Sequence, residues 1–273
     1  MSVGHYENFP VASVLLPRRL RAAVAIIYRF ARSADDIADE GDGSDEERLA
    51  GLSAYRAQLI RISGGQLPAD FPAPEMFAAL AEVIHTHRLP VRLFEDLLDA
   101  FSQDVVQKRY ADFAQVKDYC RRSANPVGRL LLHLYDAASD AAFVQSDAIC
   151  TSLQLINFCQ DVGVDFAKQR IYLPKDSLTR FGVAESDIAT GRADAGFRAL
   201  MTFEVTRARQ LMNAGAPLVK VLRGRLGWEL RLVVQGGLRI LEKIENISYD
   251  VFSQRPVLGV RDWCVMAWRA LRM

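Results

Sequence analysis

Apolar residues recur along almost the whole chain with the spacing of amphipathic helices, and the alternation typical of strands is nearly absent. Pro17 suits the first turn of a helix that continues to the neighbourhood of Glu40. Ser44 and Glu47 then form a capping-box pattern, which predicts a second helix to about Ile62. The first part of the chain is therefore predicted to be helical.

The same periodicity and a series of helix-starting residues predict helices along the rest of the chain. Their predicted ranges are 72 or 74 to 86, 90 to 106, 112 to 122, 126 to 138, 141 to 166, 184 to 191, 195 to 221, 226 to 247 and 258 to 272. Gly236 and Gly237 each weaken their helix by about 1 kcal/mol relative to alanine, so another element is expected to pack closely there. Because the sequence contains no repeat, low-complexity tract or linker, we predict one all-α domain over residues 1–273, with its sites between the helices of a bundle.

Composition and charge exclude several classes of function. Half of the 273 residues are hydrophobic, which allows a sizeable core, and the net charge of +1 gives no electrostatic reason to expect nucleic acid as a partner. No basic and apolar leader begins the sequence and no run of about 18 apolar residues could span a bilayer, so we expect a soluble, cytoplasmic protein. The sequence lacks the nucleophile-elbow motif, which would indicate a Ser/His/Asp hydrolase. It also lacks the G-x-G-x-x-G motif, which would indicate a dinucleotide-dependent enzyme.

The cysteines do not form a recognisable metal or disulfide pattern. Cys120, Cys150, Cys159 and Cys264 are scattered and lack C-x-x-C spacing. We expect them to be buried free thiols.

The candidate chemistry lies in an acidic stretch embedded among apolar residues, Q-L-I-N-F-C-Q-D-V-G-V-D, from Gln154 to Asp165. Asn157, Asp161 and Asp165 recur every four residues, which on a helix places them on one face about 6 Å apart along the axis. Acids on a helix built for burial need a partner. The stretch is therefore a candidate ligand stripe.

A second acidic cluster lies upstream, where Asp35 and Asp39 are again four residues apart and Asp36 and Glu40 add two more carboxylates. If the two stretches face each other, each carboxylate contact near 4 Å costs roughly 4 kcal/mol at an effective dielectric constant of 20, so a cation must offset the repulsion. Oxygen ligands without cysteine or histidine suit Mg²⁺. The alternative is that each acidic run is a solvated helix face.

Several residues beside the acidic clusters are further candidates for the site. Arg32 and Arg170 could each bind a phosphate through the planar guanidinium fork, although either could equally be a surface arginine. Tyr28, Tyr172 and Gln154 are expected to line the same space, with a packing role as the alternative for the tyrosines. Two acid-rich helices across an apolar bundle suit the metal-assisted departure of a diphosphate, which leaves a carbocation in a dry pocket.

The sequence resembles the squalene/phytoene synthase family from about His5 to Glu245. H-Y-E-N-F, L-L-P and A-R-S-A-D-D-I-A-D match the opening block of that family, and S-L-Q-L-I-N-F-C-Q-D-V-G-V-D with R-I-Y-L-P matches its second block. The resemblance implies an isoprenoid-synthase-type helical bundle with a central cavity. It also implies the roles of the site residues: Asp35, Asp39, Asn157, Asp161 and Asp165 bind Mg²⁺, Arg32 contacts diphosphate, and Gln154 and Tyr28 line the cavity.

Departures from the family pattern indicate which branch the chain is most like. Tyr6, Glu7 and Asn8 stand where typical members have S-K-S, Gln160 stands where they have arginine, and Arg121 and Arg122 stand where they place a tyrosine that assists the first half-reaction. These departures put two-step synthesis in doubt. Together with residues 229–245 they resemble the hydroxysqualene synthase branch of the bacterial hopanoid pathway.

That branch resemblance implies ionisation of presqualene diphosphate, rearrangement of the cation and capture by water, without NADPH. It further implies a sequential partnership with a presqualene diphosphate synthase. The alternatives are a two-step squalene, presqualene diphosphate or phytoene synthase, and a non-catalytic scaffold protein with the same fold. Separately, the tail W-C-V-M-A-W-R-A-L-R-M could form an interfacial helix in peripheral contact with the inner face of a membrane, or pack on the bundle.

Overall fold

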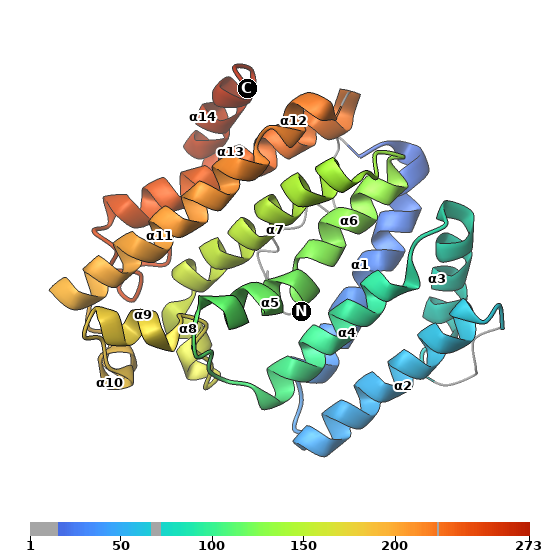
Figure 1. Cartoon of the computed structure of the whole chain (residues 1–273), viewed down its shortest axis with the longest axis horizontal. Coiled ribbons are helices and arrows are strands. Elements are labelled where there is room, and N and C mark those ends of the chain that lie inside the picture. The colour runs from blue at the N-terminus through green and yellow to red at the C-terminus, as the bar shows by residue number, and fades with distance from the viewer. Residues whose placement is uncertain (1–15, 67–71, 223) are drawn as a thin grey trace.

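A computed structural model describes residues 16–66, 72–222 and 224–273 of the chain (Figure 1). Within these ranges the secondary structure is helical, and the only strand-like pairing is an isolated bridge between Arg109 and Ile171. The helices are α1 (Arg18–Asp39), α2 (Asp45–Ser63), α3 (Pro74–His87), α4 (Val91–Val106), α5 (Phe113–Ser123), α6 (Asn125–Leu134), α7 (Asp140–Gln160), α8 (Val162–Ala167), α9 (Lys175–Arg180), α10 (Glu185–Ala189), α11 (Ala195–Gly215), α12 (Leu218–Val221), α13 (Gly224–Asn246) and α14 (Val260–Ala270). The predicted all-α class is confirmed.

Local signals placed most helix starts correctly. Pro17 precedes the first residue of α1, and the Ser44 hydroxyl accepts a hydrogen bond from the backbone N–H of Glu47 at 3.2 Å while the Glu47 carboxylate accepts one from the Ser44 N–H at 2.8 Å. The predicted capping box is therefore confirmed. The Asp112 carboxylate accepts a hydrogen bond from the backbone N–H of Gln115 at 2.9 Å and so caps α5.

Two predicted helices were wrong in their extent, and one helix was not predicted. The predicted helix 141–166 is divided into α7 and α8 at Asp161, whose backbone leaves helical geometry at φ −110° and ψ 17°. The predicted helix 195–221 ends at Gly215, which presses against α7, and resumes after Pro217 as the short α12. Pro174 ends one segment but also precedes the unpredicted helix α9, because a proline is tolerated at a helix start.

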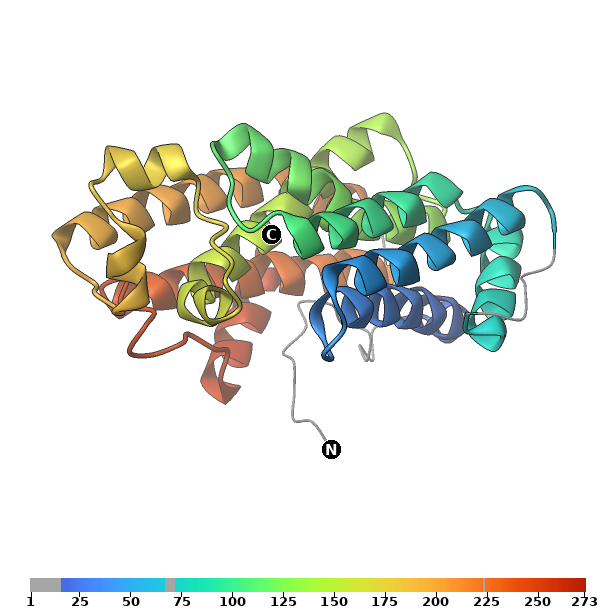
Figure 2. The same cartoon turned by 90° about the horizontal axis from the view of Figure 1, so that it is seen from below.

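The helices build two hydrophobic clusters, and α4 and α6 contribute residues to both. One cluster contains buried residues of α1 to α4 and includes Phe30, Phe77 and Phe94, whose rings meet edge to face. The other contains residues of α5, α7, α11 and α13. In both views α1 to α4 lie on one side of the molecule and α11 and α13 on the other (Figures 1 and 2). A ligand that contacts residues from both sides of the molecule must therefore lie between the two clusters.

At Gly237, α13 packs closely against α7 and α11. A methyl group at this position would lie 2.7 Å from the Met212 side chain and 3.1 Å from that of Ile156. Close packing at the glycine pair, predicted from the sequence, is confirmed. The predicted burial of all four thiols was wrong: Cys120 and Cys159 are buried, but Cys264 is exposed.

Within the described residues, no helix combines the length and the apolar character that crossing a bilayer requires.

Candidate active site

The first acidic motif occupies the last turns of α1. Asp39 accepts two hydrogen bonds from the Arg170 guanidinium, at 2.9 and 2.5 Å, and one from Lys168 Nζ at 3.2 Å. Both cations follow directly after α8, which carries Asp165. The segment after the second acidic stretch therefore contacts the first motif across 131 residues of sequence.

Arg170 decides the ionisation of Asp39. Burial raises the pKa of Asp39, but the hydrogen bonds and positive charge of Arg170, with a contribution from Lys168, outweigh burial and hold this pKa below its usual range. The Arg170–Asp39 pair is well shielded, since the two side chains are 10% and 15% exposed. Asp39 is therefore a fixed anion in this structure.

The second acidic motif begins at the break between α7 and α8. The backbone N–H of Asp161 donates to the Asn157 carbonyl at 2.8 Å, and that of Asp165 donates to the Asp161 carbonyl at 2.8 Å, so the three residues remain on one stripe despite the break. The Asp161 carboxylate accepts hydrogen bonds from Arg255 at 2.5 and 3.0 Å. Arg255 belongs to the loop between α13 and α14.

A buried acid that the sequence did not single out lies near both motifs. Asp104 of α4 is 5% exposed and accepts hydrogen bonds from the hydroxyls of Tyr119 at 2.6 Å and Tyr172 at 3.0 Å. Its backbone carbonyl accepts a further bond from Arg170 at 3.2 Å. Burial raises the pKa of Asp104 to about 6, against the opposing effects of Tyr119 and Arg170.

Each motif also contains an aspartate whose negative charge is poorly compensated by nearby cations, namely Asp35 in the first motif and Asp165 in the second. Burial and the negative charge of Asp39 raise the pKa of Asp35 to about 7, and burial and the charge of Asp161 raise that of Asp165 to about 7. The charge of Asp104 contributes to both shifts. The site therefore concentrates more negative charge than its own arginines and Lys168 balance, and a bound cation would relieve this excess.

The donor set suits a magnesium ion that arrives with its substrate. Within residues 16–66, 72–222 and 224–273, no three acidic, histidine or cysteine side chains are grouped closely enough to hold a metal ion by themselves. Mg²⁺ normally takes one or two carboxylates and completes its coordination with water and substrate phosphates. Asp35 and Asp165, the two poorly compensated carboxylates, fit this requirement.

The remaining predicted residues occupy varied positions around the acids. Arg32 pairs with Asp36 at 2.6 Å and also contacts Asp35 and Glu40 of its own helix. Tyr172 is 8% exposed and stacks on Phe158. Three more predicted residues are half-buried, namely Tyr28, Gln154 and Asn157. Tyr172 therefore acts through packing and through its bond to Asp104.

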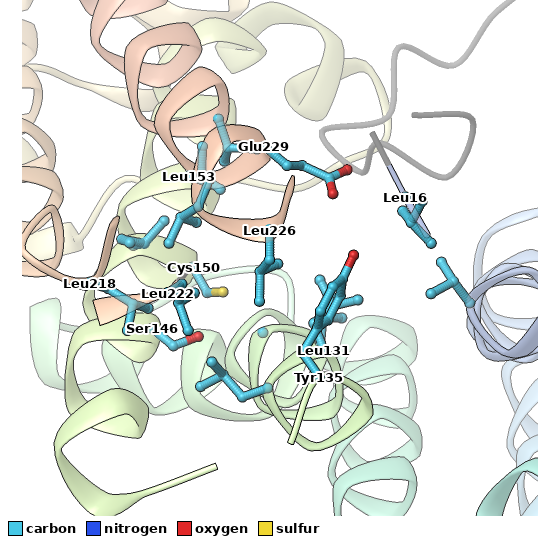
Figure 3. A pocket seen from close by; sticks show the side chains of 17 residues that line it. Leu16, Leu131, Tyr135, Ser146, Cys150, Leu153, Leu218, Leu222, Leu226 and Glu229 are labelled. Carbon is cyan, nitrogen blue, oxygen red and sulfur yellow. The ribbon is translucent and has the colours of Figure 1, made fainter. Parts of the chain in front are cut away.

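An apolar hollow lies between the two hydrophobic clusters (Figure 3). It is lined by the start of α1, one face of α6, the middle of α7, and residues of α12 and α13, and its empty space including the open mouth is about 780 Å³. Val24 on α1 borders it and precedes Asp35 by eleven residues, which corresponds to about 16 Å along the helix axis. The acids therefore lie toward the C-terminal ends of α1 and α7, and the hollow borders earlier residues of both helices.

Tyr135 and Glu229 are polar exceptions in the lining. Figure 3 shows the Tyr135 hydroxyl and the Glu229 carboxylate directed toward the same part of the hollow. The Tyr135 hydroxyl has no hydrogen-bond partner among the described residues. Burial raises the pKa of Tyr135 to about 12, with a contribution from the Glu229 charge.

Sequence reasoning missed Asp104, Lys168, Arg255 and Tyr119 as site residues. The basic segment K-Q-R after α8 did point to Arg170, but nothing local indicated that its partner would be Asp39. The departures at Tyr6, Glu7 and Asn8 lie outside the described residues.

Comparisons with known proteins identify the family and the fold. A model of the squalene/phytoene synthase family matches residues 3–262. The chain is 33% identical to a hydroxysqualene synthase of Sinorhizobium fredii over 88% of this chain and 80% of that protein, and 28% identical to a 15-cis-phytoene synthase of Synechococcus elongatus over 99% and 88%. A crystal structure of squalene synthase HpnC from Alicyclobacillus acidocaldarius superposes with a TM-score of 0.82 at 38% identity, covering 90% of each chain.

Proposed function

The chain belongs to the squalene/phytoene synthase family, and we propose that it converts presqualene diphosphate and water into hydroxysqualene and inorganic diphosphate, with Mg²⁺ and without NADPH. The observation that carries this proposal is the contact of Arg170, which follows the second aspartate motif, with Asp39 of the first motif, beside helices that also border an apolar hollow. Relatives named hydroxysqualene synthases support the choice of reaction.

The aspartate motifs would hold the metal and, through it, the leaving group. Asp35, Asp39, Asn157, Asp161 and Asp165 would be the ligands, and bound Mg²⁺ would neutralise the charge that grows on diphosphate as the carbon–oxygen bond breaks. Before substrate binds, Arg170 and Arg255 neutralise Asp39 and Asp161. The same guanidiniums would be available to diphosphate oxygens once the carboxylates have other partners.

The hydrocarbon part of the substrate would occupy the hollow. Its lining is mostly apolar and would keep water away from a cyclopropylcarbinyl cation until rearrangement is complete. One water molecule then adds to the rearranged cation and loses a proton, which balances the departure of diphosphate. A presqualene diphosphate synthase would be the sequential partner that supplies the substrate.

The direct test is incubation of the purified protein with presqualene diphosphate and Mg²⁺ in the absence of NADPH, followed by mass spectrometry of the products. Hydroxysqualene and free diphosphate are expected in equal amounts. Intact presqualene diphosphate after incubation, under conditions where thermal unfolding shows a folded protein, would overturn the proposal.

A two-step prenyl synthase is the second candidate, and the similarity to phytoene synthases favours it. This activity would consume farnesyl or geranylgeranyl diphosphate as the sole prenyl substrate. The same assay with each of these two compounds, without presqualene diphosphate, separates the candidates.

A further inference from the structure

The three tryptophans of the chain are all partly exposed, and two of them lie on the last helix. Trp228, Trp263 and Trp268 are 41%, 50% and 53% exposed. Tryptophan is a mostly buried residue in soluble proteins, and it is enriched where one side of a surface is apolar and the other is wet. Trp228 on α13 lies near the end of α14, because Arg231 contacts its ring and also donates to the Ala270 carbonyl.

The inward face of α14 is already fixed to the body of the protein. Asp262 accepts hydrogen bonds from Arg239 at 2.7 Å and Lys243 at 2.8 Å, and Met266 packs beside Gly236. The pKa of Asp262 lies well below its usual range because of Lys243, the Gly259 N–H and Arg239. Because the inward face of α14 already packs on the protein, the exposed face of this helix is its outward face in the folded chain.

That outward face is apolar as well. Val260 is 85% exposed and Leu271 is 67% exposed, and Cys264, Ala267 and Trp268 between them are exposed too. Their spacing places them along one stripe of the helix. We define the α14 outer face as this stripe together with Trp263.

The charges around the α14 outer face are positive. Asp262 is the only acid in residues 257–273, and it is buried and paired. Arg261 and Arg272 are exposed at the two ends of the face, and Arg272 lies over the Trp268 ring at 3.7 Å. Apolar and tryptophan side chains flanked by arginines suit the headgroup region of an anionic bilayer.

We propose that α14 binds the surface of an anionic lipid bilayer, with the α14 outer face in the interface and Arg261 and Arg272 at lipid phosphates. A second copy of the chain is the weaker candidate, because a helix of 11 residues is about 16 Å long, whereas stable protein interfaces involve about 20–30 residues from each partner. The proposal is independent of the reaction proposed above. A membrane would nevertheless be a suitable acceptor for an apolar isoprenoid product.

Intrinsic fluorescence offers a specific test, because every tryptophan of the chain lies on or beside α14. The full-length protein is titrated with phosphatidylglycerol vesicles and with phosphatidylcholine vesicles, and binding is confirmed by flotation. We expect a blue shift of the emission and flotation with phosphatidylglycerol, and at least several-fold weaker binding to phosphatidylcholine.

Substitutions separate the α14 outer face from the rest of the surface. Trp263→Ser with Leu271→Ser should lower vesicle binding more than tenfold, whereas Val144→Ser, at an α7 position that is 70% exposed, should leave it unchanged. Arg261→Gln with Arg272→Gln should weaken binding several-fold on phosphatidylglycerol alone. Circular dichroism checks that each variant is folded.

Cys264 provides a second reporter, since it is exposed, whereas two of the other cysteines are buried and the third is partly buried. An environment-sensitive dye on Cys264 should brighten on vesicle binding. The proposal is overturned if the wild-type protein neither floats nor shifts its emission, or if the Trp263 and Leu271 variant binds as well as the wild type. It is also overturned if the blue shift follows protein concentration without lipid and light scattering shows a dimer.

Discussion

The two aspartate motifs carry the same residue type at the same spacing, yet the structure holds them differently. In each motif one aspartate pairs with a distant arginine and the pKa of the other is raised to about 7. Arg170, which holds the α1 motif, is 10% exposed and also bonds the Asp104 carbonyl. Arg255, which holds the motif after α7, is 36% exposed and lies on a loop.

This difference separates a fixed half of the site from an adjustable half. Releasing Asp39 would leave two shielded charges, whereas Arg255 is 36% exposed and can be solvated when its pair with Asp161 opens. We infer that a substrate rearranges the Arg255 side of the site more readily than the Arg170 side.

The largest expected effect comes from breaking the buried pair. Arg170→Ala should lower the free energy of unfolding by about 3–5 kcal/mol, because Asp39 is left without its main cation near Asp104. Arg255→Ala is the matched variant and should cost at most about 1 kcal/mol, since its pair is partly solvated. Urea unfolding of both proteins measures the difference. Equal losses would contradict the distinction between the two halves.

Activity should depend on both motifs, whatever their stability. Asp161→Asn and Asp39→Asn are each expected to reduce turnover of the prenyl diphosphate by more than about 100-fold, because each removes a charged oxygen from the metal-binding set. Asp161→Asn should keep nearly wild-type stability, and Asp39→Asn should also lose stability by stranding Arg170. Ser102→Ala is a control on α4 that removes a bond to the Leu98 carbonyl and no bond to an acid. Turnover by Asp161→Asn at the wild-type rate would remove that residue from the site.

The pH dependence of stability should come from the poorly compensated aspartates. Asp35 and Asp165 have a pKa of about 7 in the folded chain against 3.8 for an ordinary aspartate, so between these values the folded state binds more protons than the unfolded state. Their contribution therefore makes the metal-free protein less stable as pH rises from about 4 to about 7, and constant above that range.

Thermal unfolding across this pH range, with and without Mg²⁺, checks the prediction. The stabilisation by Mg²⁺ should be larger at pH 8 than at pH 6, because deprotonated carboxylates bind the ion. Asp35→Asn should flatten part of the pH dependence. A Mg²⁺ effect that is the same at both pH values would contradict this account.

The smallest expected change in stability comes from a substitution in the lining of the apolar hollow. Tyr135→Phe should change the free energy of unfolding by less than about 1 kcal/mol, because the hydroxyl has no hydrogen-bond partner among the described residues. Tyr119→Phe is the matched variant and should cost more, since its hydroxyl donates to buried Asp104 at 2.6 Å. Chemical denaturation of the pair gives the comparison, and a larger loss for Tyr135→Phe would be inconsistent with it.

The sequence predicted what is encoded locally. The start of α1 and the Ser44 capping box follow from a few neighbouring residues, and so the prediction was correct. The break at Asp161 was missed, since the carboxylate there is held by Arg255, 94 residues away. Asp104 was missed because nothing in its helix distinguishes it from Asp99, which pairs with Arg56 at the surface. Long-range pairing of charges decided each of these cases.

The position of the hollow between two separately packed clusters has a consequence for how relatives can diverge. Leu226, Leu230 and Val233 line the hollow and only pack against a cluster, so they can change in size with less effect on either core than lining residues that are buried in one, such as Leu132 and Ile149. Selection for longer or shorter hydrocarbon chains can therefore act on the lining while the folding of the protein is left largely intact. A scaffold of this kind allows new products to evolve at little cost in stability.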